Sequence, residues 1–489
     1  MGLENVGDLA LHVVLSKLGP KGTALVSCVN KRFKITASED CLWSKFCSQD
    51  LDLHAPLDPN GNLAPSFKVL ILFYFMCRNN AFLLTAPFPF SSQAVYQMWR
   101  EAFGMYPWPL VKRVKRCWDG LKNWLTINFP EAKATLRRGA SEAELQELEN
   151  VLKVKLPIPT RILYRFCDGQ ESMGNDFDSV VGSSLGIIGG YSFYDHLTNV
   201  YLLPLSQIIQ YTKEITRQLS FPSRSKYILV AASSTSNDKY FFLSCADGQL
   251  YVGTRNLVLV EMIPCVPIAL ISFGNGVNSA QQQDGMLLWL EEHGRRLQNG
   301  IIKLHEDKIR SINLFPEEPP LCCSAVTNGV KGWGFLLVLL EAEWGVPFGE
   351  VRASAVFIPE LADLQDDSER YLFAYSIRMS LLPEGCILNG MTFSSCQLQW
   401  RHWIICANNV VVSDTNGEAV IGQFPLLLPG EKEFVYQSYT PLQATTGSVK
   451  GSFTFVPGRS GFSDQDHLDL QLVSTAQAQD GDQELEGPG

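Results

Sequence analysis

The sequence predicts a multidomain α+β protein with a small helical N-terminal unit, an α+β middle domain and an all-β C-terminal domain. The chain has 489 residues, more than one hydrophobic core usually organises. Apolar residues recur at helical spacing over the first 50 residues. Beyond residue 180 their period shifts toward two, which is typical of strands.

The composition is that of a folded protein. Hydrophobic residues make up 46% of the chain and charged residues 18%. The net charge of −10 argues against a nucleic-acid partner, because affinity for nucleic acid comes largely from clustered Lys and Arg. We expect no membrane partner either, since no apolar run reaches the roughly 20 residues that span a bilayer.

The cysteines point to a reducing compartment. The 13 cysteines are scattered singly apart from Cys322-Cys323, with no C-x-x-C pair, and no Cys/His block has zinc-ligand spacing. The first 20 residues lack the basic start and long apolar run of a signal peptide. We therefore expect a cytoplasmic or nuclear protein that holds no metal and no cofactor.

The first 50 residues predict three short helices. Apolar residues recur at helical spacing before and after a break at Gly19-Pro20, and a third turn follows around Leu42 and Trp43. A unit of about 50 residues with apolar side chains on more than one face is marginal alone. We expect it to offer an apolar face to a partner.

Residues 51–112 read as a linker followed by a helical region, and helical spacing continues to residue 130. A capping box predicts a helix start at Ser141, with Glu144 reaching back to it, and Leu156-Pro157 ends this helix. Residues 227–231 and 240–243 are strand-like, and Asp247-Gly248 indicates a tight turn. The middle region is therefore predicted to be α+β.

Strands dominate after a boundary at residues 317–320, which carry two prolines. Apolar residues alternate along 373–379 and 398–404, and the pairs 434/436 and 453/455 mark later strands. Asn416-Gly417 indicates a turn. This pattern is typical of an antiparallel sandwich, with a closing strand over 468–472 and a disordered tail at 476–489.

The segment GDLALHVVLSKLGPKGTALVSCVNKRF, followed by CLW, resembles the F-box, and the resemblance covers residues 1–50. In that family the Leu/Val positions and the Trp pack the helices and dock on a Skp-type adaptor, which joins the receptor to a cullin. The family's usual Leu-Pro opening is Val6-Gly7 here. The resemblance implies adaptor binding by Leu9, Val13, Leu18, Pro20, Leu25, Val29, Phe33 and Trp43.

Residues 113–312 resemble a SUKH (Smi/Knr-type) domain through the run SEAELQELENVLKVKLPIPTRILYRFCDGQ. Members of that family are mostly protein-interaction modules. The resemblance implies an α+β interaction domain in the middle of the chain.

Residues 321–475 are similar to ApaG domains, which are immunoglobulin-like sandwiches, through NGEAVIGQFPLLLPGEKEFVYQSYTPLQATTGSVKGSFTF. The family's Gly-rich loop has been linked to pyrophosphate or metal binding. The resemblance places a ligand loop at Gly417, Glu418, Ala419 and Gly422. Ala419 stands where a second glycine is usual, and its Cβ hinders close approach of a phosphate.

The order F-box, SUKH, ApaG resembles that of the plant Skp-interacting F-box proteins. It implies a non-catalytic substrate adaptor of a Skp-cullin-F-box ubiquitin ligase that recruits an unidentified substrate protein for ubiquitination and degradation. The alternative is a binding protein whose ApaG loop senses pyrophosphate or a nucleotide. Two apolar segments, 69–93 and 331–350, interrupt the resemblance, and we interpret both as possible insertions.

Other chemical signals are weaker. Gly182 to Gly186 has the G-x-S-x-G form of a hydrolase elbow around Ser184, but two glycines soon after it favour a glycine loop over the helix such an elbow needs. His402, between two tryptophans, is more consistent with a structural histidine than with a metal ligand. The basic run 112–116 is either a nuclear import signal or a solvated helix face, and the second reading is favoured.

Overall fold

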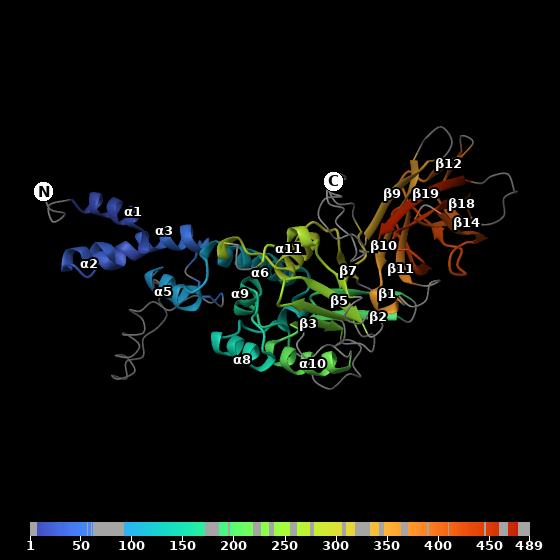
Figure 1. Cartoon of the computed structure of the whole chain (residues 1–489). Helices are drawn as coiled ribbons and strands as arrows, with labels where there is room; N and C mark the ends of the chain where they lie inside the picture. The colour runs from blue at the N-terminus through green and yellow to red at the C-terminus, as the bar shows by residue number, and fades with distance from the viewer. Residues whose placement is uncertain are drawn as a thin grey trace, which may run out of the picture.

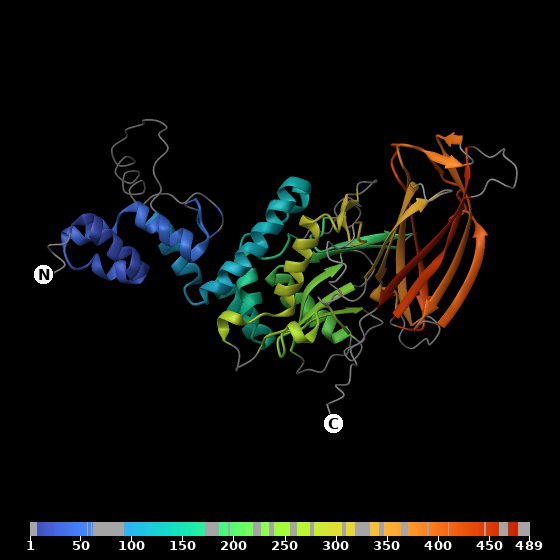
Figure 2. The same cartoon turned by 90° about the horizontal axis from the view of Figure 1, so that it is seen from above.

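The computed structural model describes residues 7–55, 57–59, 61, 92–171, 185–193, 196–218, 226–233, 239–254, 262–273, 278–305, 310–317, 333–341, 347–362, 370–388, 391–408, 410–444, 446–458 and 468–477. Helices near the N-terminus lead into a mixed helix and sheet region, and a β-sandwich follows at the far end (Figure 1). The same order is plain from above in Figure 2. The predicted multidomain α+β architecture is confirmed.

Three helices open the chain: α1 (Asp8–Val26), α2 (Lys31–Ala37) and α3 (Asp40–Leu51). The predicted break at Gly19-Pro20 is a kink inside α1, where Gly19 has φ 74° and ψ 178°. Pro20 can only begin a new helical stretch, because it has no N–H to bond backwards. The side chain of Asn30 caps α2 by accepting from the backbone N–H of Phe33 at 2.9 Å.

Helices α5 (Ser92–Phe103), α6 (Trp108–Asn128) and α7 (Pro130–Ala134) connect this unit to the sheet. Trp99 and Trp118 are fully buried, and Trp99 stacks on Phe103. One hydrophobic core runs from Leu11 to Ile312. The N-terminal helices are therefore packed onto the connecting helices, and this continuity stabilises a unit too small to be stable alone.

The middle region wraps α8 (Glu142–Leu152), α9 (Ile158–Phe166), α10 (Leu205–Gln218) and α11 (Gly285–Gln298) around one sheet. Its strand order is β6-β5-β4-β3-β2-β1-β8-β7. The predicted capping box at Ser141 and Glu144 is present. The strands are β1 (Gly189–Phe193), β2 (His196–Leu202), β3 (Tyr227–Ser233), β4 (Lys239–Ser244), β5 (Leu250–Thr254), β6 (Ile263–Pro264), β7 (Lys303–His305) and β8 (Ser311–Asn313).

The C-terminal region is the predicted antiparallel sandwich. One sheet has the order β17-β11-β10-β9 and the other the order β15-β14-β18-β19, with the short β16 (Leu426–Leu427) beside β14. The core between them contains Trp403, Tyr436, Phe453 and Phe455. The strands are β9 (Trp333–Glu341), β10 (Pro347–Phe357), β11 (Tyr371–Leu381), β12 (Cys386–Leu388), β13 (Met391–Phe393), β14 (Cys396–Ala407), β15 (Val410–Glu418), β17 (Phe434–Leu442), β18 (Thr446–Pro457) and β19 (Leu468–Gln477).

The turn predicted at Asn416-Gly417 is wrong, because both residues lie inside β15, paired with β14. The chain reverses instead at Ile421 and Gly422, where φ is 44° and 73°. The closing strand predicted at 468–472 is confirmed as part of β19. Residues 69–91 of the first suspected insertion, 69–93, lie outside the described residues, whereas β9 and the start of β10 fall within the second, 331–350.

None of the described helices is both long enough and apolar enough to cross a membrane.

Candidate functional site

Large apolar side chains are exposed on the first two helices and on the turn between them. Five of the residues that the F-box resemblance assigned to adaptor binding are exposed, led by Leu9 at 82%. Large apolar side chains in water mark an interaction surface when they gather on one small unit. Sequence reasoning missed Ile35 on α2, which is also exposed. We call this surface the docking face, and its residues are Leu9, Val13, Leu18, Leu25, Val29 and Ile35.

Three of the assigned residues are not on the docking face. Pro20 is half-buried at the kink of α1, and Phe33 and Trp43 lie in the core. The Trp43 indole N–H donates to the carbonyl of Ala37 at 2.6 Å, and its ring packs 5.5 Å from that of Tyr96 on α5. Phe33 and Trp43 therefore pack beneath the docking face, and their assignment to adaptor binding stays a prediction.

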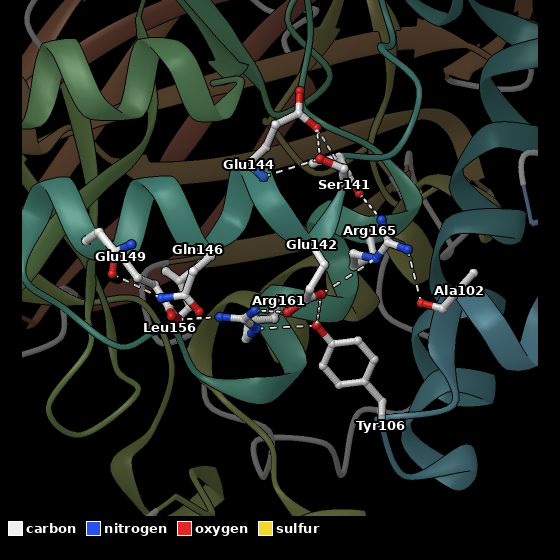
Figure 3. Close-up of polar contacts among 12 residues, drawn as sticks. Ala102, Tyr106, Ser141, Glu142, Glu144, Gln146, Glu149, Leu156, Arg161 and Arg165 are labelled. Carbon is white, nitrogen blue, oxygen red and sulfur yellow. Dashed lines mark hydrogen bonds and ion pairs between the residues drawn. The ribbon is translucent and has the colours of Figure 1, made fainter.

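Polar contacts hold α8 and α9 against the connecting helices (Figure 3). The Arg161 guanidinium pairs with Glu142 and, at 2.5 Å, with the buried Glu149. Tyr106, which precedes α6, donates its hydroxyl to Glu142 at 2.7 Å. Burial raises the pKa of Tyr106 to about 12, so its hydroxyl stays protonated and remains a donor. Arg165 reaches the Ala102 carbonyl at 3.0 Å, which ties α9 to α5.

The Asp168-Gly169-Gln170 turn of the SUKH-like run is also structural. The Asp168 carboxylate accepts from the Leu205 N–H at 2.8 Å and from Arg137 at 3.1 Å. The Gln170 side chain accepts from the Ile187 N–H at 3.0 Å and donates to the Leu185 carbonyl at 2.9 Å. The polar side chains of this run therefore hold the fold together and do not converge on a reactive centre.

A buried joint connects the middle sheet to the sandwich. Glu360, in the short 3-10 turn after β10, is buried against three strands of the middle sheet. Its Oε1 accepts from Tyr191 at 2.6 Å and Thr198 at 3.0 Å, and lies 3.2 Å from His196 Nε2. Lys239 Nζ lies 3.6 Å from Oε2. No signal in the sequence identified this joint.

Electrostatics keep this carboxylate charged. Burial pushes the pKa of Glu360 upward, but Lys239 and the bonds from His196 and Tyr191 act more strongly together and hold it at about 2. Apolar residues from both sides surround the network: Tyr191, Phe193 and Phe315 pack against Val356, Ile358, Leu372 and Ala374. Because a buried ion pair tolerates little change in geometry, the joint fixes the sandwich on the middle sheet.

The candidate ligand loop is a closed hairpin. The N–H of Ala419 donates to Gln399 at 2.9 Å and that of Val420 to Gln423 at 3.2 Å, so neither is directed at a ligand. Gly417 lies beside the Arg401 side chain, whose guanidinium donates to the Ala419 carbonyl at 3.1 Å. Phosphate loops offer several unsatisfied N–H groups, so the geometry here gives pyrophosphate binding no support.

Ala419 is buried and has φ 44°, a conformation that glycine adopts more readily. The backbone conformation at this position therefore explains why glycine is usual there in ApaG domains, without reference to a ligand.

A cleft of about 1300 Å³ separates the ends of α6 and α11 from the sandwich. Its walls include Lys303, Leu304 and His305 of β7 on one side and four residues of β17, from Phe434 to Gln437, on the other. Ile421 of the hairpin also borders it. Sequence reasoning missed the cleft, because it is made by segments more than 100 residues apart in the chain.

The remaining sequence candidates are accounted for locally. His402 bonds Asp414 at 2.7 Å, and Ser184 lies outside the described residues. The basic run is used within the fold: Arg113 pairs with Glu291 at 2.7 Å and Lys115 with Asp119 at 2.5 Å. These pairs favour the helix-face reading.

Burial raises the pKa of several thiols, those of Cys47 and Cys167 to about 12, so they are poor nucleophiles at neutral pH. Within the described part of the chain, one group could hold a metal: His12, Glu39 and Cys41, whose ligand atoms lie within 4.8 Å of one another. It is partly exposed at the surface of α1 and α3, and His12 already bonds Glu39 at 3.0 Å.

Comparison with known proteins gives one long match. The chain is 55% identical over 461 residues to F-box protein SKIP16 of Arabidopsis thaliana, covering 94% of each chain. It is 25% identical over 351 residues to human F-box only protein 3, covering 70% of this chain and 61% of that protein. The family described as ApaG domain matches residues 362–457.

A solved structure titled as the putative ApaA protein from Bordetella pertussis aligns with 26% identity and a TM-score of 0.22, covering 30% of this chain and 97% of that one.

Proposed function

We propose that this chain, which belongs to the F-box protein family of SKIP16, is the substrate-recognition adaptor of a Skp-cullin-F-box ubiquitin ligase. The docking face binds a Skp-type adaptor and, through it, the cullin. The middle region and the sandwich bind the protein to be ubiquitinated. The chain itself is a non-catalytic receptor that works by proximity, because holding a target near the charged conjugating enzyme raises the effective concentration of its lysines.

The docking face is the observation that carries this proposal. Leu15 of α1, Phe33 of α2 and Leu42, Trp43 and Phe46 of α3 are buried, whereas the apolar residues of the docking face remain exposed to water. A soluble unit gains nothing from such exposure by itself, so a partner that covers the face is the simplest physical account.

Capture of a purified Skp adaptor tests the proposal. Leu25 is 66% exposed, so Leu25→Asp leaves the core intact while placing a charge in the contact. Losing the burial of one leucine and desolvating a carboxylate should weaken binding by at least about 100-fold. The matched control is Val410→Asp on β15, where the valine is 65% exposed and distant in the chain, and its binding should equal that of the wild type.

Equal capture of wild type and Leu25→Asp at concentrations near the dissociation constant would contradict adaptor binding by the docking face. Circular dichroism of both variants shows whether the helices are retained. Trp43→Ala is not a suitable probe, because it removes a core side chain and would unfold the unit whatever its partner.

A further inference from the structure

The cleft between the middle sheet and the sandwich is bordered by two sheet edges. β7 ends the strand order of the middle sheet and β17 ends that of its sandwich sheet, as far as the described strands extend. In Figure 1, β7 lies at the side of the middle sheet that faces the sandwich. A terminal strand directs alternate N–H and C=O groups away from its sheet, and these groups can pair with another chain.

The lining shows that the cleft follows these edges. Four consecutive residues of β17, from Phe434 to Gln437, border it, as do the three consecutive residues of β7. Successive side chains of a strand point to opposite faces of its sheet, so a cavity against one face would touch every second residue only. Contact with consecutive residues places the cavity alongside the strand.

The size of the cleft suits a peptide. Its volume of about 1300 Å³ exceeds the roughly 300–1,000 Å³ of sites that enclose small molecules. β17 has nine residues and β7 has three, so β17 provides the longer edge. Val435, on the part of β17 that borders the cleft, is 38% exposed.

The charges at the cleft favour an acidic occupant. Four cations line it, Lys303, Arg310, Arg378 and Lys432, against two carboxylates, Glu317 and Glu433. Each carboxylate is already paired: Arg378 contacts Glu317 at 3.0 Å and Glu433 at 3.5 Å. Arg310 also pairs with Glu131 at 3.1 Å, and Lys303 Nζ lies 3.5 Å from Glu317. The lining nevertheless carries more cations than carboxylates, in a chain whose net charge is −10.

We propose that an extended, acidic segment of the target protein binds in this cleft by adding a strand to the edge of β17. The backbone of the segment pairs with β17, its alternate side chains contact Phe434 and Val435, and its carboxylates face the cations that line the cleft, Lys432 among them. This inference rests on the proposed function for the identity of the target, and it adds where and in what form the target is held. The joint at Glu360 connects the two regions that form the walls.

A random dodecapeptide library displayed on phage is the probe, selected against the full chain. Selected sequences should be rich in Asp and Glu and should alternate apolar with polar residues. Capped synthetic copies should bind Val435→Asp at least about tenfold more weakly than the wild type, because the new carboxylate repels an acidic strand. Lys432→Glu should weaken binding in the same direction. Val412→Asp, a matched change at an exposed valine of β15, should leave binding unchanged.

Backbone pairing has its own test. N-methylation of alternate amides along one edge of the best peptide removes two or more hydrogen bonds, each worth about 0.5–1.5 kcal/mol, and should weaken binding about tenfold or more. The proposal is overturned if no sequence is enriched, if Val435→Asp binds as the wild type does, or if the methylated peptides of both edges bind as tightly as the parent peptide.

The same preparations are assayed for Skp capture, which separates the two claims. Peptide binding without Skp capture would reject the ligase role and keep the cleft. Skp capture without peptide binding would reject the cleft and keep the ligase role.

Discussion

The joint at Glu360 gives the sharpest stability prediction. Lys239→Met removes the cation 3.6 Å from Glu360 Oε2 but keeps the length of the side chain. Both side chains are less than a tenth exposed. Removing one partner of a buried pair leaves an uncompensated charge and typically costs about 3–5 kcal/mol. The fall of the Glu360 pKa from 4.5 to about 2, to which Lys239, His196 and Tyr191 contribute together, corresponds to about 3 kcal/mol in total.

The expected result is a loss of about 3 kcal/mol in the free energy of unfolding of Lys239→Met, measured by urea titration with near-ultraviolet circular dichroism. Hydrogen exchange should rise in β1, β2 and the 3-10 turn Pro359–Leu361 and stay unchanged in α1 to α3. The double variant Lys239→Met with Glu360→Gln should recover most of the loss, because no bare charge remains. A loss below about 1 kcal/mol, or a double variant as unstable as the single one, would refute the reasoning.

The joint at Glu360 also predicts that the protein loses folding stability at low pH. The folded pKa of Glu360 lies below its unfolded value, so its contribution is complete above pH 4.5 and is lost as the pH falls toward 2. Glu360→Gln should flatten this part of the stability profile. If the stability of the wild type falls no more steeply between pH 4.5 and 2 than that of Glu360→Gln, the low pKa of Glu360 is contradicted.

Three further predictions concern single sites. Ser141→Ala removes the two hydrogen bonds of the Ser141 hydroxyl, one from the N–H and one to the carboxylate of Glu144, and should cost about 1 kcal/mol in thermal unfolding, against no change for the exposed neighbour substitution Glu147→Ala. Burial lowers the pKa of His293 to about 4, below its unfolded value of 6.5, so stability should fall as the pH drops from 6.5 to 4, and His293→Gln should remove this slope; equal slopes would contradict it. Ile421 has φ 44°, so Ile421→Gly should stabilise the chain by about 1 kcal/mol, and destabilisation would show that the turn is not strained.

Local signals in the sequence predicted local features well. Gly19-Pro20 broke the first helix, and Ser141 with Glu144 began another, because these residues act on backbone groups within four positions. The alternation of apolar residues gave the sandwich, since one face of each sheet must be buried. The resemblance to plant Skp-interacting F-box proteins is confirmed by the long match to SKIP16.

Features made by distant segments could not be predicted. Trp43 was grouped with the contact residues because its partner Tyr96 lies more than 50 positions away on α5. The carboxylate of Glu360 contacts residues from β1, β2 and β4, and no spacing in the sequence predicts these contacts. Asn416-Gly417 is a strong turn signal, yet pairing with β14 along eight residues of β15 outweighs it and moves the reversal to Ile421.

Three sets of assignments stay predictions: the domain limits at 50, 112, 312 and 475, the two insertions, and the adaptor-binding residues. The hydrophobic core is continuous from Leu11 to Ile312, so packing is not interrupted at the predicted boundary at residue 50. It also connects the docking face to the middle region that borders the cleft.

Hydrogen exchange of the full chain with and without a saturating Skp adaptor tests the central claim most directly. Protection should appear in peptides covering residues 8–36, which contain the docking face, and β7 and β17 should exchange unchanged, since the target side stays free in that complex. Absence of protection in residues 8–36, or protection confined to the cleft or the sandwich, would contradict the account.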